Sequence, residues 1–304
     1  MDDTILKLES ITKMYGKNTV VKDFSMSLQK GHICGLIGPN GAGKTTIMKI
    51  IAGLARPDSG SMTFFSDKTD LDRSRSRMSF MLEAPIIDSG LTAYYNMQYV
   101  RRIKGVADKK KINELLEFTG LSDTGKKPAG KFSLGMKQRL GIAMALLTQP
   151  EIMVLDEPVN GLDPEGIAEI RLMLKKLAEE KYVSIIISSH ILSELSELCT
   201  DFAIINHGSL IESLSRETLL TKCSNHITVR TDDINRTAAV IENKLDIHRF
   251  KVVHGEEIHI FEHLDDIDNI SKTITGSGLI IRKLICEGES LEQYYLSKAG
   301  VQHE

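Results

Sequence analysis

The chain has 304 residues, enough to bury one sizeable core or two smaller ones. Its composition, 41% hydrophobic and 26% charged, is that of an ordinary globular protein, and a formal net charge of −3 argues against nucleic acid as the main partner. No apolar stretch approaches the roughly 20 residues that a membrane-spanning helix needs, so we expect any membrane role to come through a partner.

The N-terminus and the cysteines bear on cellular location. The chain starts with Met1, Asp2 and Asp3, which lack a basic and then apolar leader, so we expect no signal peptide. The four cysteines are widely scattered, which predicts inert thiols in a reducing cytosol rather than a zinc or redox pair.

The first two-thirds of the chain alternates expected strands and helices. Residues 6–11 and 24–28 alternate apolar and polar side chains, as half-buried strands do. Short apolar runs at residues 32–37, 152–155 and 183–188 are typical of buried parallel strands. Helical spacing covers residues 45–54, 93–104, 109–119, 136–147 and 164–181. This order predicts an α/β domain over residues 1–221, with a mostly parallel sheet covered by helices.

The remaining residues, 222–304, predict a small α+β accessory domain. A strand, a helix, two strands, a helix and a strand are expected in turn, at residues 227–230, 235–244, 248–253, 258–261, 265–273 and 279–286. This βαββαβ order matches a ferredoxin-like split motif. We expect a further helix over residues 290–300. The segment carries no chemical motif, which favours a packing or regulatory appendage.

A glycine-rich segment follows the expected strand at residues 34–37 and opens the next helix. It fits the phosphate-binding pattern G-x-x-x-x-G-K-[ST] at all eight positions. Glycines let backbone N–H groups point at phosphate oxygens, Lys44 would reach the β- and γ-phosphates, and the Thr45 hydroxyl would bind Mg²⁺. A glycine turn without nucleotide is the weaker alternative. The predicted ATP-binding residues here are Gly38, Pro39, Asn40, Gly41, Ala42, Gly43, Lys44, Thr45 and Thr46.

Two acids end the apolar strand at residues 152–155. At the carboxyl edge of a parallel sheet, beside the phosphate loop, Asp156 would hold Mg²⁺ and Glu157 would act as general base toward the attacking water. His190 follows the strand at residues 183–188 and would lie near the γ-phosphate at the same edge. A serine and a glycine, Ser133 and Gly135, stand where the helix at residues 136–147 begins, which predicts a second anion site.

In this combination and order, the motifs resemble the ATP-binding cassette (ABC) family over about residues 4–220. The resemblance implies a P-loop NTPase cassette with an antiparallel β subdomain and a helical subdomain. Residues 38–45 resemble the Walker A loop, residues 152–157 the Walker B strand with its catalytic glutamate, and residues 132–136 the signature that reaches the ATP of a second copy. Asp163 belongs to a segment that resembles the D-loop, His190 resembles the switch histidine, and Tyr15, between the first two strands, resembles the aromatic residue that stacks on adenine.

Three departures from the family pattern are visible. The signature reads Phe-Ser-Leu-Gly-Met rather than Leu-Ser-Gly-Gly-Gln, the usual loop glutamine is replaced by Glu83, and the tail after residue 221 is extra. A carboxylate at position 83 only accepts hydrogen bonds and adds negative charge near Mg²⁺, so we assign Glu83 to the ATP and metal site. We expect Glu83→Gln to alter either the Mg²⁺ dependence or the substrate-stimulated turnover. These departures, with the segments at residues 188–194 and 290–295, resemble the bacitracin-resistance and lantibiotic-immunity exporters of Gram-positive bacteria.

The resemblance implies an ATPase with ATP and Mg²⁺ as cofactors, Lys44, Glu157 and His190 as catalytic residues, and a nucleotide-sandwich homodimer. It further implies a separate integral-membrane permease, so that the chain would lie peripherally on the cytoplasmic face of the membrane and power export of a drug or peptide antibiotic. Other readings remain: an exporter of other cargo, a soluble family member acting on ribosomes or DNA, a non-enzymatic regulatory switch, and a small-molecule kinase. The kinase alternative leaves residues 132–136 unexplained.

Overall fold

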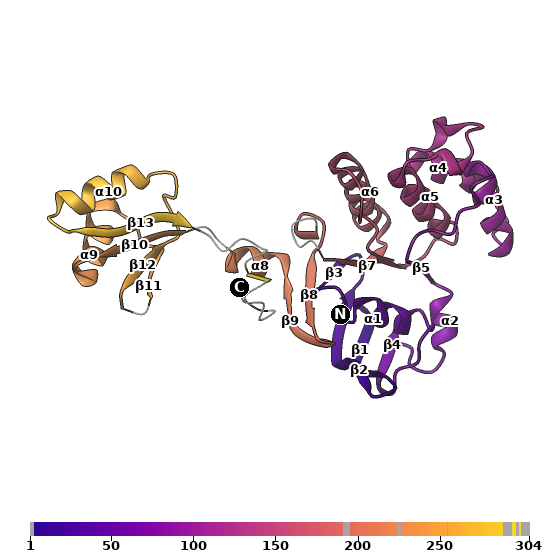
Figure 1. Ribbon diagram of the computed structural model, residues 1–304, viewed down its shortest axis with the longest axis horizontal. Helices are drawn as coiled ribbons and strands as arrows, with labels where there is room; N and C mark the ends of the chain where they lie inside the picture. The colour runs from indigo at the N-terminus through magenta and orange to yellow at the C-terminus, as the bar shows by residue number, and fades with distance from the viewer. Residues whose placement is uncertain are drawn as a thin grey trace. The chain divides into compact units, whose positions relative to one another are not determined.

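The computed structural model describes residues 3–190, 195–223, 226–253 and 255–287, together with Tyr294, Tyr295 and Lys298. The chain divides into two compact units, one running to Arg216 and the other from Glu217 to Ser297. This division and the domain boundary predicted after residue 221 fall within the same helix, α8 (Arg216–Lys222) (Figure 1). The helix predicted at residues 290–300 lies outside the described residues, except for Tyr294, Tyr295 and Lys298.

A six-stranded sheet forms the centre of the first unit, in the order β5-β6-β7-β3-β8-β9. Every pair in it is parallel except β8–β9. Its strands are β3 (Ile33–Ile37), β5 (Met78–Leu82), β6 (Ile152–Asp156), β7 (Ser184–Ser189), β8 (Asp201–Asn206) and β9 (Ser209–Ser215). Strands β3, β6 and β7 are buried at every position, as expected for parallel strands with helices on both faces. The apolar runs therefore predicted these three strands correctly.

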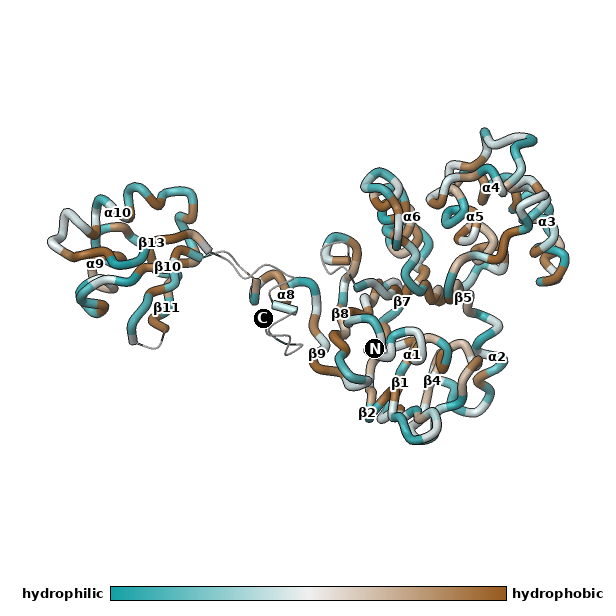
Figure 2. The backbone as a smooth tube through the Cα atoms, viewed as in Figure 1, coloured by the Kyte–Doolittle hydropathy of each residue, from teal (hydrophilic) through white to brown (hydrophobic). Residues whose placement is uncertain are grey.

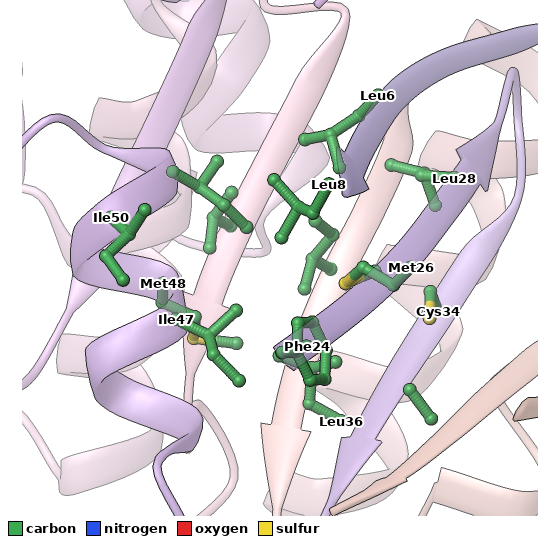
Figure 3. Packing of buried hydrophobic residues seen from close by; sticks show 14 of the residues in the cluster. Leu6, Leu8, Phe24, Met26, Leu28, Cys34, Leu36, Ile47, Met48 and Ile50 are labelled. Atoms are coloured by element: carbon green, nitrogen blue, oxygen red, sulfur yellow. The ribbon is translucent and has the colours of Figure 1, made fainter. Parts of the chain in front are cut away.

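A second, antiparallel sheet has the order β2-β1-β4, with β1 (Thr4–Tyr15), β2 (Asn18–Gln29) and β4 (Ser59–Phe64). Its apolar side chains share one cluster with β3 and the helix α1 (Lys44–Ile51). Figure 3 shows Leu8 and Phe24 of this sheet facing Ile47 and Met48 of α1, all four of them at most 1% exposed. This packing fixes α1, which begins where the glycine-rich segment ends.

Helices α3 (Ala93–Ile103), α4 (Lys110–Phe118) and α5 (Leu134–Leu146) pack on one another around a separate cluster that includes Met97, Leu116 and Leu140 (Figure 1). Short turns at η1 (Ser122–Thr124) and η2 (Ala129–Lys131) lead from α4 to α5. The prediction that this last helix starts at residue 136 was wrong, because the Ser133 hydroxyl accepts a hydrogen bond from the N–H of Met136 and caps the helix earlier.

Two further helices complete the first unit. Helix α6 (Pro164–Lys181) connects β6 to β7, and the short α2 (Leu71–Arg75) precedes β5. Figure 2 shows brown hydrophobic and teal hydrophilic residues together on α6, as expected for a helix with one buried face. In the described parts of the chain, the structure contains no helix with the length and apolarity needed to span a bilayer.

The second unit has the predicted βαββαβ order: β10 (His226–Thr231), α9 (Ile234–Leu245), β11 (Phe250–Val253), β12 (Glu257–Ile260), α10 (Ile267–Gly276) and β13 (Ile281–Glu287). Its sheet is antiparallel, in the order β11-β12-β10-β13. Ile227, Val229 and Ile258 on the strands and Ile241 and Ile274 on the helices share a core of their own. The unit therefore has an independent hydrophobic core.

Candidate nucleotide-binding and catalytic site

The predicted catalytic residues meet at one edge of the central sheet. Parallel pairing places β7 between β3 and β6, so the carboxyl ends of these three strands are adjacent. The glycine-rich loop leaves β3, Asp156 ends β6, and His190 follows β7. In open α/β sheets this edge is where ligands bind.

The loop conformation depends on glycine. Gly41 and Gly43 have φ values of +81° and +103°, and a Cβ on Gly43 would lie 2.8 Å from the carbonyl oxygen of Val20. Gly43 is also the N-cap of α1, so the N–H groups of the first helical turn point toward the loop. A cavity of 170 Å³ lies here, lined by Val20, Asn40, Gly41, Ala42, Gly43, Lys44, Thr45, Thr46 and Glu157. This concave, N–H-rich surface suits phosphate.

Lys44 is only 6% exposed. Its ammonium donates hydrogen bonds to the carbonyl oxygens of Gly38 (2.7 Å) and Pro39 (3.2 Å) and lies 3.7 Å from Oε1 of Glu157. Burial lowers the pKa of Lys44, and the carboxylates of Glu157 and Asp156 oppose that shift. The side chain is thus held at the loop, facing the carboxylates of Glu157 and Asp156.

Thr45 and Asp156 form a pair of oxygen groups suited to a hard cation. The Thr45 hydroxyl donates to Oδ2 of Asp156 at 2.7 Å, and the carboxylate is largely buried, with 8% of the residue exposed. Hydroxyl and carboxylate oxygens from a loop and a strand end are the ligands Mg²⁺ takes in nucleotide sites. The residues present therefore fit the metal that the sequence predicts.

Glu157 is held at both its backbone and its side chain. Its N–H donates to the Ser188 hydroxyl at 2.9 Å, and its Oε2 lies 2.7 Å from Nδ1 of His190. Its φ of +48° is left-handed, a conformation that non-glycine residues adopt uncommonly. Ser188 was not among the predicted site residues, although it ends an expected apolar strand two residues before His190.

Glu83 lies at the same sheet edge but points to another partner. It follows β5, whose last residue, Leu82, pairs with Asp156. Its carboxylate lies 3.4 Å from the ammonium of Lys49 on α1, and 71% of its side chain is exposed. The Glu83 carboxylate thus contacts Lys49 and has no contact with Thr45 or Asp156 among the hydrogen bonds and ion pairs of the described residues. Its role in metal binding stays a prediction.

The other predicted ATP-binding residues, Ser133 and Gly135 for a second copy's nucleotide and Asp163 in the D-loop-like segment, lie at two other helix starts. Ser133 caps α5, and Asp163 caps α6 by accepting a hydrogen bond from the N–H of Gly166 at 3.3 Å. A Cβ on Gly135 would meet its nearest neighbour, Leu162, at 3.8 Å, so the two helix starts are close together. Within the described residues, no hydrogen bond or ion pair links Ser133 or Asp163 to the phosphate loop.

Tyr15 is the last residue of β1 rather than part of the connection between the first two strands, because β1 extends beyond residue 11. The pairing of Tyr15 with Asn18 accounts for that extension. The side chain is half-exposed, and the Lys13 ammonium lies 5.2 Å from the ring centroid. An exposed ring in this position remains available for stacking.

Comparison with known proteins decides the family. The family model described as ABC transporter matches residues 21–160. The bacitracin transport ATP-binding protein BcrA of Bacillus licheniformis is 38% identical over 302 residues, 98% of this chain and 98% of that protein. This chain belongs to the ABC transporter ATP-binding family. The lantibiotic transport ATP-binding protein SrtF of Streptococcus pyogenes is 43% identical, over 68% of this chain and 89% of its own length.

Solved structures of ABC ATP-binding subunits share the fold of the first unit. The CbiO1 structure from Clostridium perfringens, part of the ABC transporter complex CbiONQ, is 25% identical with a TM-score of 0.66, covering 72% of this chain and 92% of that one. A structure described as the ATP-binding subunit of an ABC transporter is 26% identical with a TM-score of 0.63, covering 71% of this chain and 92% of its own. The predicted ABC cassette and the suspected subfamily are confirmed, and the chain is an ATP-binding, ATP-hydrolysing subunit.

Proposed function

We propose that this chain powers export of a drug or peptide antibiotic of the bacitracin or lantibiotic type through a separate membrane permease. The observation that carries this proposal is the extent of the similarity to BcrA, which spans both units of the chain. The similarity to SrtF covers a smaller share of the chain. A relative that shares the accessory unit as well as the cassette is the better guide to cargo class.

In the proposed site the triphosphate binds against the N–H groups before α1. Lys44 exchanges its carbonyl partners for β- and γ-phosphate oxygens, which are stronger, charged acceptors. Thr45 and Asp156 hold Mg²⁺, which neutralises phosphate charge when bound. The Tyr15 ring stacks on adenine, where a π-face suffices, and Glu83, which follows the residue paired with Asp156, influences the metal through its charge.

Hydrolysis in this proposal places a water between Glu157 and the γ-phosphorus. The water oxygen forms a bond to phosphorus as the bond to the ADP oxygen breaks, and the water proton passes to Glu157 before leaving with phosphate or solvent. His190, hydrogen-bonded to Oε2 of Glu157, holds that carboxylate in place and reaches the γ-phosphate. The ion pair of Glu157 with Lys44 supports this arrangement, because it already points the carboxylate toward the phosphate loop.

We further propose that a second copy of the chain completes each site. The start of α5, with Ser133 and Gly135, would bind the γ-phosphate held by the other copy, and Asp163 would line the interface between the two. The free helix start at Ser133 and the lack of a side chain on Gly135, which would let a phosphate approach the backbone, support this arrangement. Closure of the pair would drive the permease on the cytoplasmic face of the membrane, and hydrolysis would reopen it.

The test combines purified protein with antibiotic-sensitive cells. Cells express the chain together with a candidate membrane permease, and the minimum inhibitory concentrations of bacitracin and of a lantibiotic are measured. We expect wild type to raise one of them. Glu157→Gln should abolish that protection and lower ATP turnover by about 100-fold or more while leaving ATP binding intact. Glu180→Gln, the same chemical change at an exposed position on α6, serves as control.

Two outcomes would contradict these proposals separately. Unchanged turnover in Glu157→Gln would remove the assigned role of that carboxylate. Normal ATPase activity together with unaltered sensitivity to both antibiotics would reject the cargo class and leave the ATPase assignment standing.

A further inference from the structure

The Ser188 hydroxyl lies between the two acids of the site. In the parallel pairing of β6 with β7, Leu155 is opposite Ile187, so the next residues, Asp156 and Ser188, are neighbours. Ser188 is fully buried, at 0% exposure. A polar side chain in such a position has to be satisfied by hydrogen bonds within the protein.

The hydroxyl makes two hydrogen bonds of opposite sense. It donates to Oδ1 of Asp156 at 2.5 Å and accepts from the N–H of Glu157 at 2.9 Å. A hydroxyl has a single proton to donate, so a donor bond to the carboxylate leaves its lone pairs for the amide. One side chain therefore contacts the metal-binding acid and the backbone of the general base together.

The bond to Asp156 determines which of its oxygens is available. Oδ1 is taken by Ser188, and Oδ2 faces the Thr45 hydroxyl, the other proposed metal ligand. If the Ser188 bond were lost, the carboxylate could rotate about its last torsion, which is broad for aspartate. The pair formed by Thr45 and Asp156 would then no longer present a fixed geometry.

The bond to Glu157 stabilises an unfavourable backbone. The left-handed φ of +48° at Glu157 directs its side chain toward Lys44 and His190. The surroundings must hold such a conformation in place, and an N–H bonded to a buried hydroxyl contributes to that. An apolar residue at position 188 would leave this N–H without its acceptor.

We propose that Ser188 is a positioning residue for ATP hydrolysis, setting the orientation of Asp156 and the backbone of Glu157 through one hydroxyl. The inference rests on the proposed roles of those two acids. Ser188 does not touch nucleotide in this proposal. Its removal should therefore impair the hydrolytic step and the use of Mg²⁺ while sparing binding of ATP to the loop.

The decisive comparison is Ser188→Thr against Ser188→Val. Both side chains are β-branched and alike in shape, so any strain from the added bulk is shared, and they differ mainly in the hydroxyl. We expect the kcat of Ser188→Thr to stay within about threefold of wild type. The kcat of Ser188→Val should fall roughly ten- to hundredfold, as expected when a hydrogen bond to a charged group is lost. Val should also raise the Mg²⁺ concentration for half-maximal activity, whereas Mg²⁺-free binding of a fluorescent ATP analogue stays within about twofold of wild type.

A purely structural role predicts a different result. Thr and Val would then change kcat equally, or Val would lower the melting temperature while its kcat and Mg²⁺ dependence stayed normal, and either result overturns the proposal. If neither Ser188→Thr nor Ser188→Val folds, Ser188→Ala, which adds no atoms, tests the same point. A wild-type kcat and Mg²⁺ dependence in Ser188→Ala would reject a positioning role. If Glu157→Gln leaves turnover intact, the proposed catalytic role of Glu157 fails. If Glu157→Gln abolishes turnover while Ser188→Val has the same kcat as Ser188→Thr, only the inference about Ser188 fails.

Discussion

Gly43→Ala is expected to disable nucleotide binding with little effect on the rest of the fold. The backbone at Gly43 has φ +103° and ψ 0°, and a Cβ there would lie 2.8 Å from the carbonyl oxygen of Val20, closer than real Cβ contacts. A left-handed conformation costs an L-residue roughly 1–2 kcal/mol, and forcing an atom into a packed site adds about 1–3 kcal/mol. The loop conformation that binds phosphate is therefore destabilised by about 2–5 kcal/mol.

That free energy converts into an affinity loss of roughly 30-fold to several thousandfold for ATP, since each 1.4 kcal/mol is a factor of ten. Gly41→Ala is the matched control: its φ is +81°, but a Cβ would have nothing within 4 Å, so only the conformational cost applies. We expect Gly41→Ala to lose roughly 5- to 30-fold. The assay is equilibrium titration with a fluorescent ATP analogue, with thermal melting as a check on folding.

A Gly43→Ala variant that folds normally and binds ATP as well as wild type, or no worse than Gly41→Ala, would refute this prediction. The first result would mean that the glycine conformation is not needed for phosphate binding. The second would mean that the Val20 carbonyl does not limit the space in the loop.

Three other outcomes are expected. His190→Ala should lower ATP turnover by about 10-fold or more with ATP affinity within about threefold, because the change frees the Glu157 carboxylate, the proposed general base, and leaves the phosphate loop intact; single-turnover kinetics would show this. Arg77→Ala should destabilise the fold by less than about 1 kcal/mol in urea titrations, because its two-point ion pair with Glu151 is half-exposed. The hydrogen bond from Arg77 lowers the pKa of Glu151 below its ordinary 4.5. The ion pair therefore stabilises the fold above pH 4.5, and this stabilisation is lost as the pH falls below that value. The unfolding free energy of Arg77→Ala should accordingly decrease less steeply at acidic pH than that of wild type. In thiol labelling, exposed Cys286 should react in the native protein and Cys34 only after unfolding, since burial raises the pKa of Cys34 to about 12.

The local motifs were readable because their function depends on spacing along the chain. A loop that must wrap a phosphate needs glycines and a lysine at fixed offsets, so Gly43, Lys44 and Thr45 could be assigned from order alone. The apolar runs of β3, β6 and β7 were equally clear, since parallel strands are buried on both faces. Strands β4, β8 and β9 escaped prediction: β4 and β9 are mostly exposed or half-exposed, so neither an apolar run nor clean alternation marks them.

The sequence by itself determined the kind of fold and the family, and it predicted the acids and the loop of the site, because each follows from short-range pattern. Only the tertiary structure showed that the Ser188 hydroxyl donates a hydrogen bond to Asp156, because the two residues are 32 positions apart and meet through the register of β6 and β7. The same holds for Glu83, which was predicted at the ATP and metal site and whose carboxylate contacts Lys49 on α1. Side-chain direction and cross-strand neighbours depend on how elements pack, and the order of residues along the chain does not encode them locally.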